Sequence, residues 1–179
     1  SHSDKYYEVS ALFRKIAEML LLRDTLVFHG SALAYDGKGY IFAAPSGTGK
    51  STHAALWRKA FGEKVVMVND DKPMIRFAEG KPYVYGTPWR GKHRLGSNVK
   101  VPLEGICVLK KGETNEISTL GGISAWGFIY SQMYSPADRE LAGMVVKLAD
   151  RLVESVPVYC LQCNMDISAA HVSKSGMIK

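Results

Sequence analysis

Residues 44–51 constrain the fold of this chain more than any other segment. They are Ala-Pro-Ser-Gly-Thr-Gly-Lys-Ser, which matches the G-x-x-x-x-G-K-[ST] pattern of a Walker A phosphate loop, with alanine at the first glycine position. A methyl group is tolerated at that position as long as φ stays negative. Because such a loop joins a buried strand to a helix, the motif also predicts the structure on both of its sides.

Each residue type in this pattern has a chemical role. Gly47 and Gly49 let backbone N–H groups turn toward phosphate oxygens. Lys50 brings positive charge to the outer phosphates, and the Ser51 hydroxyl can ligate the magnesium ion that accompanies a nucleotide. The helix that follows favours anions at its first turn. We therefore predict that ATP and Mg²⁺ bind at Ala44, Pro45, Ser46, Gly47, Thr48, Gly49, Lys50, Ser51 and Thr52.

The flanks have the expected character. Residues 40–43 form a short apolar run that predicts a buried strand. Residues 52–61 place Ala54, Trp57 and Phe61 at helical spacing. The alternative is a Gly/Ser turn that only resembles the motif, but a chance turn would not require a strand before it and a helix after it.

The rest of the chain alternates between strand and helix signals. An amphipathic helix is expected over residues 6–23, and a hairpin over 74–77 and 83–85. Further strands are expected at 25–28, 32–35, 64–68, 101–109, 116–120 and 156–161, and further helices at 123–133, 137–154 and from 167 onward. No repeat or long linker interrupts this order. We expect an α/β fold in a single domain, residues 1–179.

Composition narrows the class of protein. Hydrophobic residues make up 46% and charged residues 22% of the 179 residues, as in ordinary soluble proteins. No apolar run is long enough for a membrane span or a signal peptide, which favours a cytoplasmic protein without a membrane partner. The net charge of +6 is either a solvated basic face or a field that attracts phosphate-bearing ligands. No basic run interleaved with aromatics is present, so no nucleic-acid partner is expected.

Three cysteines also favour a reducing compartment, because their number is odd and the chain is not small. Cys160 and Cys163 have C-x-x-C spacing but fall in or just after a predicted strand. A redox motif of this type would instead open a helix. We expect free, buried or half-buried thiols.

Two acids follow the strand after the loop's helix. Asp70 and Asp71 stand where a Walker B carboxylate would face magnesium. Adjacent acids can divide the work, one near the metal and one near an acceptor hydroxyl. The alternative is a strand-end Asx turn, for which Asn-Asp-Asp is also suited. His29 stands at the end of an earlier strand, and a histidine at a strand end can have a purely structural role instead of a role in the site.

Residues 87–96 combine turn formers with positive charge and are expected to form a loop. Arg90, Lys92 and Arg94 could supply charge to a transferring phosphoryl group, with Trp89 anchoring the loop against the body. The alternative is a solvated basic loop.

This pattern resembles the catalytic domain of HPr kinase/phosphorylase, in the superfamily that includes phosphoenolpyruvate carboxykinase. The resemblance rests on His29-Gly30, Pro45 to Ser51 and Val68 to Asp71, and is specific over residues 25–71. The family's Glu-Ile-Arg-Gly-x-Gly signature is not intact, because only Arg90-Gly91 matches its centre. The chain is therefore expected to be a short, divergent relative.

The resemblance implies a phosphate-loop α/β fold of the carboxykinase type, with mixed sheets and flanking helices. It implies that Lys50 binds the triphosphate and Ser51 ligates magnesium. It further implies that Asp70 takes the acceptor proton, that Asp71 supports the metal and that His29 lies close to the phosphates.

We therefore expect an ATP- and Mg²⁺-dependent kinase that acts on a hydroxyl of a protein, a peptide or a small molecule. Two alternatives stay open: a nucleotide-binding regulator without efficient turnover, and a carboxykinase-like enzyme acting on a small acid. The sequence is compatible with a homo-oligomer, but it names neither the acceptor nor the oligomeric state.

Overall fold

The structure is a computed structural model that describes residues 2–45 and 47–178. The described helices are α1 (His2–Leu21), α2 (Lys50–Phe61), the short 3₁₀ helix η1 (Gly62–Lys64), α3 (Gly122–Ser131), α4 (Arg139–Ser155) and α5 (Ser168–Met177). The described strands are β1 (Thr25–Val27), β2 (Ser31–Tyr35), β3 (Lys38–Ala43), β4 (Val65–Asn69), β5 (Met74–Ala78), β6 (Lys81–Tyr85), β7 (Lys100–Lys111), β8 (Glu116–Thr119) and β9 (Val158–Cys163).

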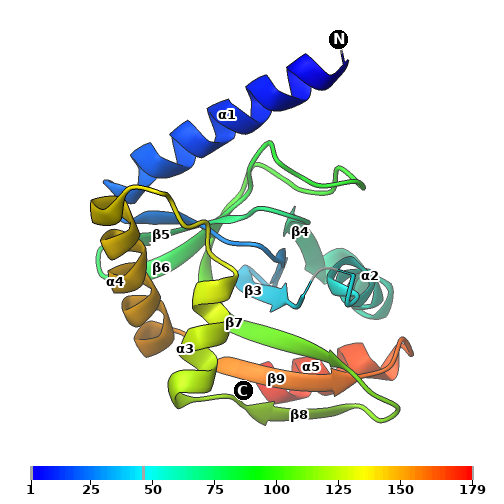
Figure 1. Cartoon of the computed structure of the whole chain (residues 1–179). Coiled ribbons are helices and arrows are strands. Elements are labelled where there is room, and N and C mark those ends of the chain that lie inside the picture. The colour runs from blue at the N-terminus through cyan, green and yellow to red at the C-terminus, as the bar shows by residue number, and fades with distance from the viewer. Residues whose placement is uncertain (1, 46, 179) are drawn as a thin grey trace.

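The strands form one mixed sheet in which the long strand β7 is the shared member (Figure 1). Its first residues pair antiparallel with β6, which continues through β5 to β1. Its later residues pair parallel with β3 on one side and with β9 on the other. β2 and β4 follow β3, and β8 follows β9, in each case antiparallel. The result is an α/β fold with a mixed sheet, as expected.

The direction of the strands brings several loops to one edge of this sheet. β3, β7 and β9 are parallel to one another. β4 has the same direction, because it is antiparallel to β2 and β2 is antiparallel to β3. The chain therefore leaves all four strands at the same edge, where binding sites of open α/β sheets lie.

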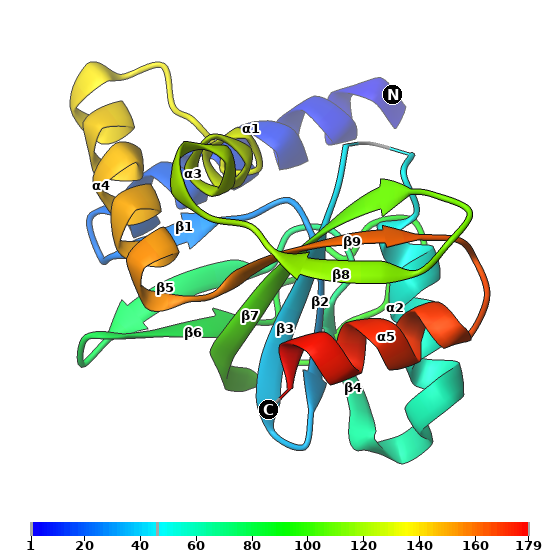
Figure 2. The same ribbon diagram turned by 90° about the horizontal axis from the view of Figure 1, so that it is seen from below.

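Helices cover both faces of the sheet (Figure 2). On one face, α2 and α5 lie side by side over a cluster that contains Trp57 and Phe42, both fully buried. On the other face, α3 and α4 pack on a second cluster that includes Phe28 and Ile129. Buried residues at helical and strand spacing thus form two hydrophobic cores, one on each face of the sheet.

Helix α1 is attached to the rest of the molecule mainly through its second half. Ala17 and Leu21 are buried, whereas Val9, Leu12 and Met19 are more than half exposed. The amphipathic pattern therefore predicted the helix correctly, although part of its apolar stripe faces solvent. Within the described residues, no helix has both the length and the apolar character needed to cross a membrane.

Gly86, which follows β6, is required by close packing rather than by an unusual φ. A Cβ at this position would overlap the Ser97 carbonyl oxygen and would also crowd the Val68 carbonyl oxygen. Both obstacles are backbone atoms, which cannot turn aside as a side chain can. We expect Gly86→Ala to lower the free energy of unfolding by about 3 kcal/mol or more in chemical denaturation.

Gly127→Ala is the matched control, because Gly127 lies within α3 and a Cβ there would meet open space. This change should leave stability equal or raise it by up to about 1 kcal/mol, since alanine is the better helix former. Equal effects of the two substitutions would contradict the packing assigned to Gly86.

Candidate functional site

Residues 44–52, here called the 44–52 loop, comprise the connection from β3 to α2 and the first three residues of α2. Gly47 and Gly49 have φ values of 76° and 103°, in the left-handed region that favours glycine. Gly49 is the residue that precedes α2, so the turn opens directly into the helix. Ser46 was also predicted to bind the nucleotide, but it lies outside the described residues. The sequence pattern therefore predicted the strand, the turn and the helix in the correct order.

The Lys50 side chain folds back into this loop. Its ammonium group donates a hydrogen bond to the Ala44 carbonyl oxygen at 2.9 Å. Partial burial lowers the pKa of Lys50, while Asp71 and Asp70 act in the opposite direction. A hollow of about 250 Å³ at the start of α2 is lined by Gly47, Gly49, Lys50, Ser51 and Thr52. The positive charge and the first turn of the helix thus face the same space.

The chain turns sharply after β4 at the predicted pair of acids. The Asn69 Oδ1 atom accepts hydrogen bonds from the backbone N–H groups of Asp71 (2.9 Å) and Lys72 (2.7 Å). This is an Asx turn, so the structural alternative for this segment is correct in its geometry. The side chain that accepts the hydrogen bonds of this turn is that of Asn69, so the carboxylates of Asp70 and Asp71 take no part in it. It leaves both acids free to have other partners.

The two carboxylates lie in different surroundings. Asp70 is buried, and its Oδ1 atom accepts a hydrogen bond from the Ser31 hydroxyl. Asp71 is about one-quarter exposed and has the Lys72 ammonium group 3.1 Å from its Oδ2 atom. One acid is therefore fixed inside the site, and the other stands at its surface.

His29 completes this group. Its Nε2 atom lies 3.8 Å from Asp71 Oδ1. Burial lowers the pKa of His29, the charge on Lys50 lowers it further, and Asp71 opposes both effects. Lys50, Asp71 and His29 thus act on one another electrostatically, although they come from three separate segments. With Asp70, the predicted residues of this set occupy one region of the molecule.

Residues 87–96, here called the 87–96 loop, are attached to the acidic turn. The Asn69 side-chain amide donates to Thr87 Oγ1 at 2.9 Å, and Thr87 Oγ1 donates to the Lys72 carbonyl oxygen at 2.9 Å. Gly91 approaches Asp71 so closely that a Cβ on the glycine would lie 3.0 Å from the Asp71 Cβ. The loop is therefore held against the acidic turn by the Thr87 side chain and by the close approach of Gly91.

Trp89 anchors the same loop to α1. Its ring packs edge-on against Phe13, with 4.9 Å between ring centroids. This contact agrees with the expectation that Trp89 fixes the loop against the body.

The two predicted arginines are less tightly held. Arg90 Nε donates to the Thr87 carbonyl oxygen at 3.3 Å, and Arg94 is exposed. Together with Pro88 and Gly91 they line a hollow of about 400 Å³. Among the described residues, neither guanidinium is paired with a carboxylate, although both belong to the loop whose Gly91 approaches Asp71.

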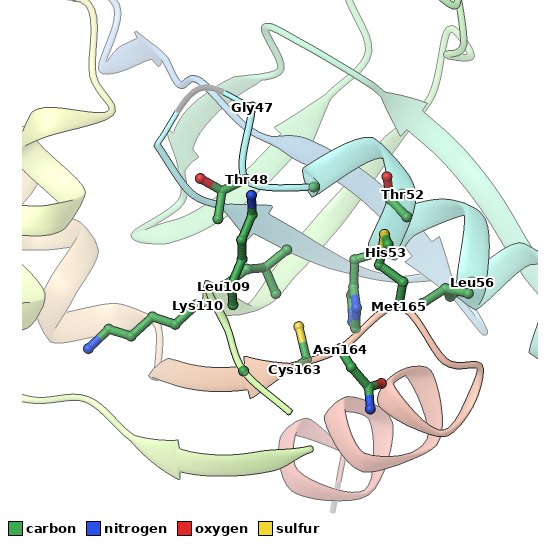
Figure 3. A pocket seen from close by; sticks show the side chains of 13 residues that line it. Gly47, Thr48, Thr52, His53, Leu56, Leu109, Lys110, Cys163, Asn164 and Met165 are labelled. Carbon is green, nitrogen blue, oxygen red and sulfur yellow. The ribbon is translucent and has the colours of Figure 1, made fainter. Parts of the chain in front are cut away.

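Sequence reasoning missed a cavity of about 410 Å³ beside the 44–52 loop (Figure 3). It lies between the start of α2 and the segments that follow β7 and β9. His53 of α2 lines this cavity and is 2% exposed, and its Nε2 atom is 3.0 Å from Ser173 Oγ. Burial lowers the pKa of His53 to about 4. Its position immediately after Thr52 was a signal, but the sequence did not show which strands would face it.

The C-x-x-C segment lies within β9, as expected, and Cys160 and Cys163 are half-buried free thiols. Burial raises the pKa of Cys163. Among the described residues, no three histidine, cysteine, aspartate or glutamate side chains gather as a metal site.

The buried His53 should make stability depend on pH. In the unfolded chain a histidine binds its proton near pH 6.5, whereas folded His53 remains neutral until about pH 4. Lowering the pH through this window therefore favours the unfolded state. We expect the free energy of unfolding to fall by about 1.4 kcal/mol per pH unit from His53, with a smaller contribution of the same sign from His29.

Urea denaturation between pH 7 and pH 4 measures this slope. His53→Phe should flatten it, whereas His93→Gln, on the exposed part of the 87–96 loop, should keep the slope of the parent. A parent protein whose stability is constant over this range would contradict the buried, neutral state of His53.

Comparison with known proteins gives the family. No curated protein sequence matches the chain. Among solved structures, the chain is similar to the HPr(Ser) kinase/phosphatase from Coxiella burnetii, with 10% sequence identity and a TM-score of 0.45. That match covers 84% of this chain and 95% of the other. The model of the SynChlorMet cassette protein ScmC family matches residues 5–169. Because this match spans most of the sequence, the chain belongs to the ScmC family.

Proposed function

We propose that this protein is an ATP- and Mg²⁺-dependent kinase that transfers the γ-phosphoryl group to a hydroxyl of a protein, a peptide or a small molecule. The observation that carries the proposal is the grouping of Lys50, Asp71 and His29 around the 44–52 loop, with Asp70 beside them. Phosphoryl transfer depends mainly on positioning and charge neutralisation. A lysine in a glycine turn, opposite two acids, provides both.

The 44–52 loop would hold the triphosphate. Its glycines expose backbone N–H groups, and the first turn of α2 adds a favourable dipole. The ammonium group of Lys50 now bonds to a carbonyl oxygen of its own loop and can turn to the outer phosphates instead. The hollow lined by this loop places these donors on one side of a ligand.

The residues present fit magnesium bound together with a nucleotide. Magnesium in such sites keeps water and phosphate ligands and needs only one or two protein oxygens. Ser51 at the start of α2 and Asp71 after β4 would supply them. When bound, the ion would neutralise charge on the phosphates. This also explains why a separate cluster of metal ligands is not needed.

Asp70 would orient the acceptor and take its proton. The Ser31 hydroxyl engages Oδ1 and fixes the plane of the carboxylate, which leaves Oδ2 for the acceptor hydroxyl. As the acceptor oxygen bonds to the γ-phosphorus, the bond from that phosphorus to the β-bridging oxygen breaks and the hydroxyl proton passes to Asp70. His29 would lie close to the phosphates, and Arg90 and Arg94 would add charge from the 87–96 loop.

Lys50→Ala tests the nucleotide part of the proposal. Loss of a charged hydrogen-bond donor to phosphate should weaken ATP–Mg²⁺ binding by about tenfold or more in titration calorimetry. Lys59→Ala, an exposed lysine two turns further along α2, is the matched control and should bind as the parent does. Equal affinities of a folded Lys50→Ala variant and the parent would refute the phosphate-loop assignment.

Asp70→Asn tests the kinase part. It should keep most of the affinity for ATP but slow transfer of labelled γ-phosphate to a cell-extract acceptor by about a hundredfold, the scale of a lost general base. Asp36→Asn, at the exposed turn between β2 and β3, is the control and should transfer at the parent rate. If the parent binds ATP and transfers nothing, the regulator hypothesis is the better one. If Asp70→Asn transfers normally, Asp70 has only a structural role.

A further inference from the structure

The cavity beside the 44–52 loop has the position and size of a ligand pocket. Its volume of about 410 Å³ is within the usual range for small-molecule sites. One wall is the loop itself, through Gly47, Thr48, Gly49 and Thr52. A ligand whose phosphates lie in the loop would therefore extend its other end into this cavity.

The remaining walls suit a flat, largely apolar group. Leu56 comes from α2, Leu109 from β7, and Cys163 and Met165 from the end of β9 and the turn after it (Figure 3). The Asn164 side chain is already engaged, since its Oδ1 atom accepts from the Asn115 amide and the Asp166 N–H and its Nδ2 atom donates to the Glu113 carbonyl oxygen. Lys110 and Lys111 of β7 also line the cavity, together with Thr48 and Thr52. The lining thus combines apolar contact with a few polar and charged groups, as is usual in small-molecule pockets.

His53 is the exception, because one of its ring nitrogens is buried and has no partner. The Ser173 hydroxyl donates to the Ala170 carbonyl oxygen at 3.0 Å and accepts from Trp57 Nε1 at 2.8 Å. Because its single proton is used, Ser173 can only accept from His53, so Nε2 carries the imidazole proton. Nδ1 is then a bare acceptor, and it makes no hydrogen bond within the described residues.

A buried acceptor without a partner is costly and points to a ligand that would supply the donor. The neighbouring Met165 is 80% exposed and has a flexible side chain, so it can turn aside when a ligand enters. Neutral His53 keeps its acceptor character at physiological pH, because burial holds its pKa at about 4.

We propose that this cavity binds the purine base of the nucleotide and that His53 Nδ1 accepts a hydrogen bond from the exocyclic amino group of adenine. The inference rests on the proposed function, because it assumes that the 44–52 loop holds the phosphates of the same molecule. Hypoxanthine has the same ring system with a carbonyl oxygen in place of that amino group. An acceptor in the pocket therefore selects adenine and disfavours hypoxanthine.

Binding of ATP and ITP, each with Mg²⁺, tests the role of His53. The parent should bind ATP about tenfold more tightly than ITP, the effect of one neutral hydrogen bond. His53→Phe should lose this preference, because ATP binding weakens and ITP binding does not. A parent that binds ITP as tightly as ATP, or more tightly, would overturn the assignment of Nδ1 as the acceptor.

Alkylation of the unmodified protein tests the position of the base and needs no variant that must fold. Cys163 lines the cavity, whereas Cys160, on the same strand, does not. ATP with Mg²⁺ should slow labelling of Cys163 by N-ethylmaleimide severalfold, as read by peptide mass spectrometry, and leave Cys160 unchanged. Inorganic tripolyphosphate, which has no base, should protect neither thiol.

The outcomes separate the two proposals. If calorimetry detects ATP binding that requires Lys50 but Cys163 is not protected, the base lies elsewhere and only the present inference fails. Equal protection by tripolyphosphate would also overturn it, because the base would not be needed. If ATP does not bind at all, the proposed function fails as well.

Discussion

The parallel pairing of β3 with β7, and of β7 with β9, is the constraint on which the candidate site depends. Parallel strands end at a common edge of the sheet, so this pairing brings the 44–52 loop next to the segments that follow β7 and β9. β4 reaches the same edge through two antiparallel steps. Each strand pairing brings side chains that are distant in sequence to this edge, so the candidate site depends on the order of the strands in the sheet.

Strand β2 runs antiparallel to β3 and β4, so it starts at the edge of the sheet where those strands end. Its first residue, Ser31, lies at the edge where its neighbours end, and for that reason its hydroxyl reaches Asp70. His29 precedes it and faces Asp71. The start of β2 and the segment before it thus supply the partners of the two acids that follow β4. This arrangement explains how a His-Gly segment and an Asp-Asp segment, about forty residues apart, become neighbours.

Much of this fold could be predicted because its signals are local. Apolar runs and helical spacing located most elements within a few residues, and the glycine-rich motif located the turn before α2. The acids were predicted from their place at a strand end. The bond from Ser31 to Asp70 and the cavity at His53 could not be predicted, since they depend on strand order and register. The exposed apolar side chains of α1 show the same limit, because periodicity predicts a helix but not which part of its stripe is covered.

The candidate site has two sides that differ in chemistry, and the 44–52 loop lies between them. On the side of α2 and α5, the cavity is mainly apolar, with His53 and its acceptor nitrogen buried in its wall and Lys110 and Lys111 also lining it. On the side of β4, the surroundings are charged, with Asp70, Asp71 and Lys72 near the 87–96 loop. A nucleotide bound across the loop would direct its base to the first side and its outer phosphates to the second.

In the proposed kinase, this difference between the two sides would also set the direction from which an acceptor approaches. The acids and the two arginines belong to the second side, where the 87–96 loop rests on α1 through Trp89 and Phe13. In the proposed kinase, an acceptor hydroxyl would reach Asp70 from this second side. Val9 and Leu12 of α1, the helix that Trp89 contacts, face solvent. Substitutions of these two residues should affect transfer to a bulky acceptor more than they affect ATP binding, because the helix contacts the 87–96 loop and does not line the cavity proposed for the base.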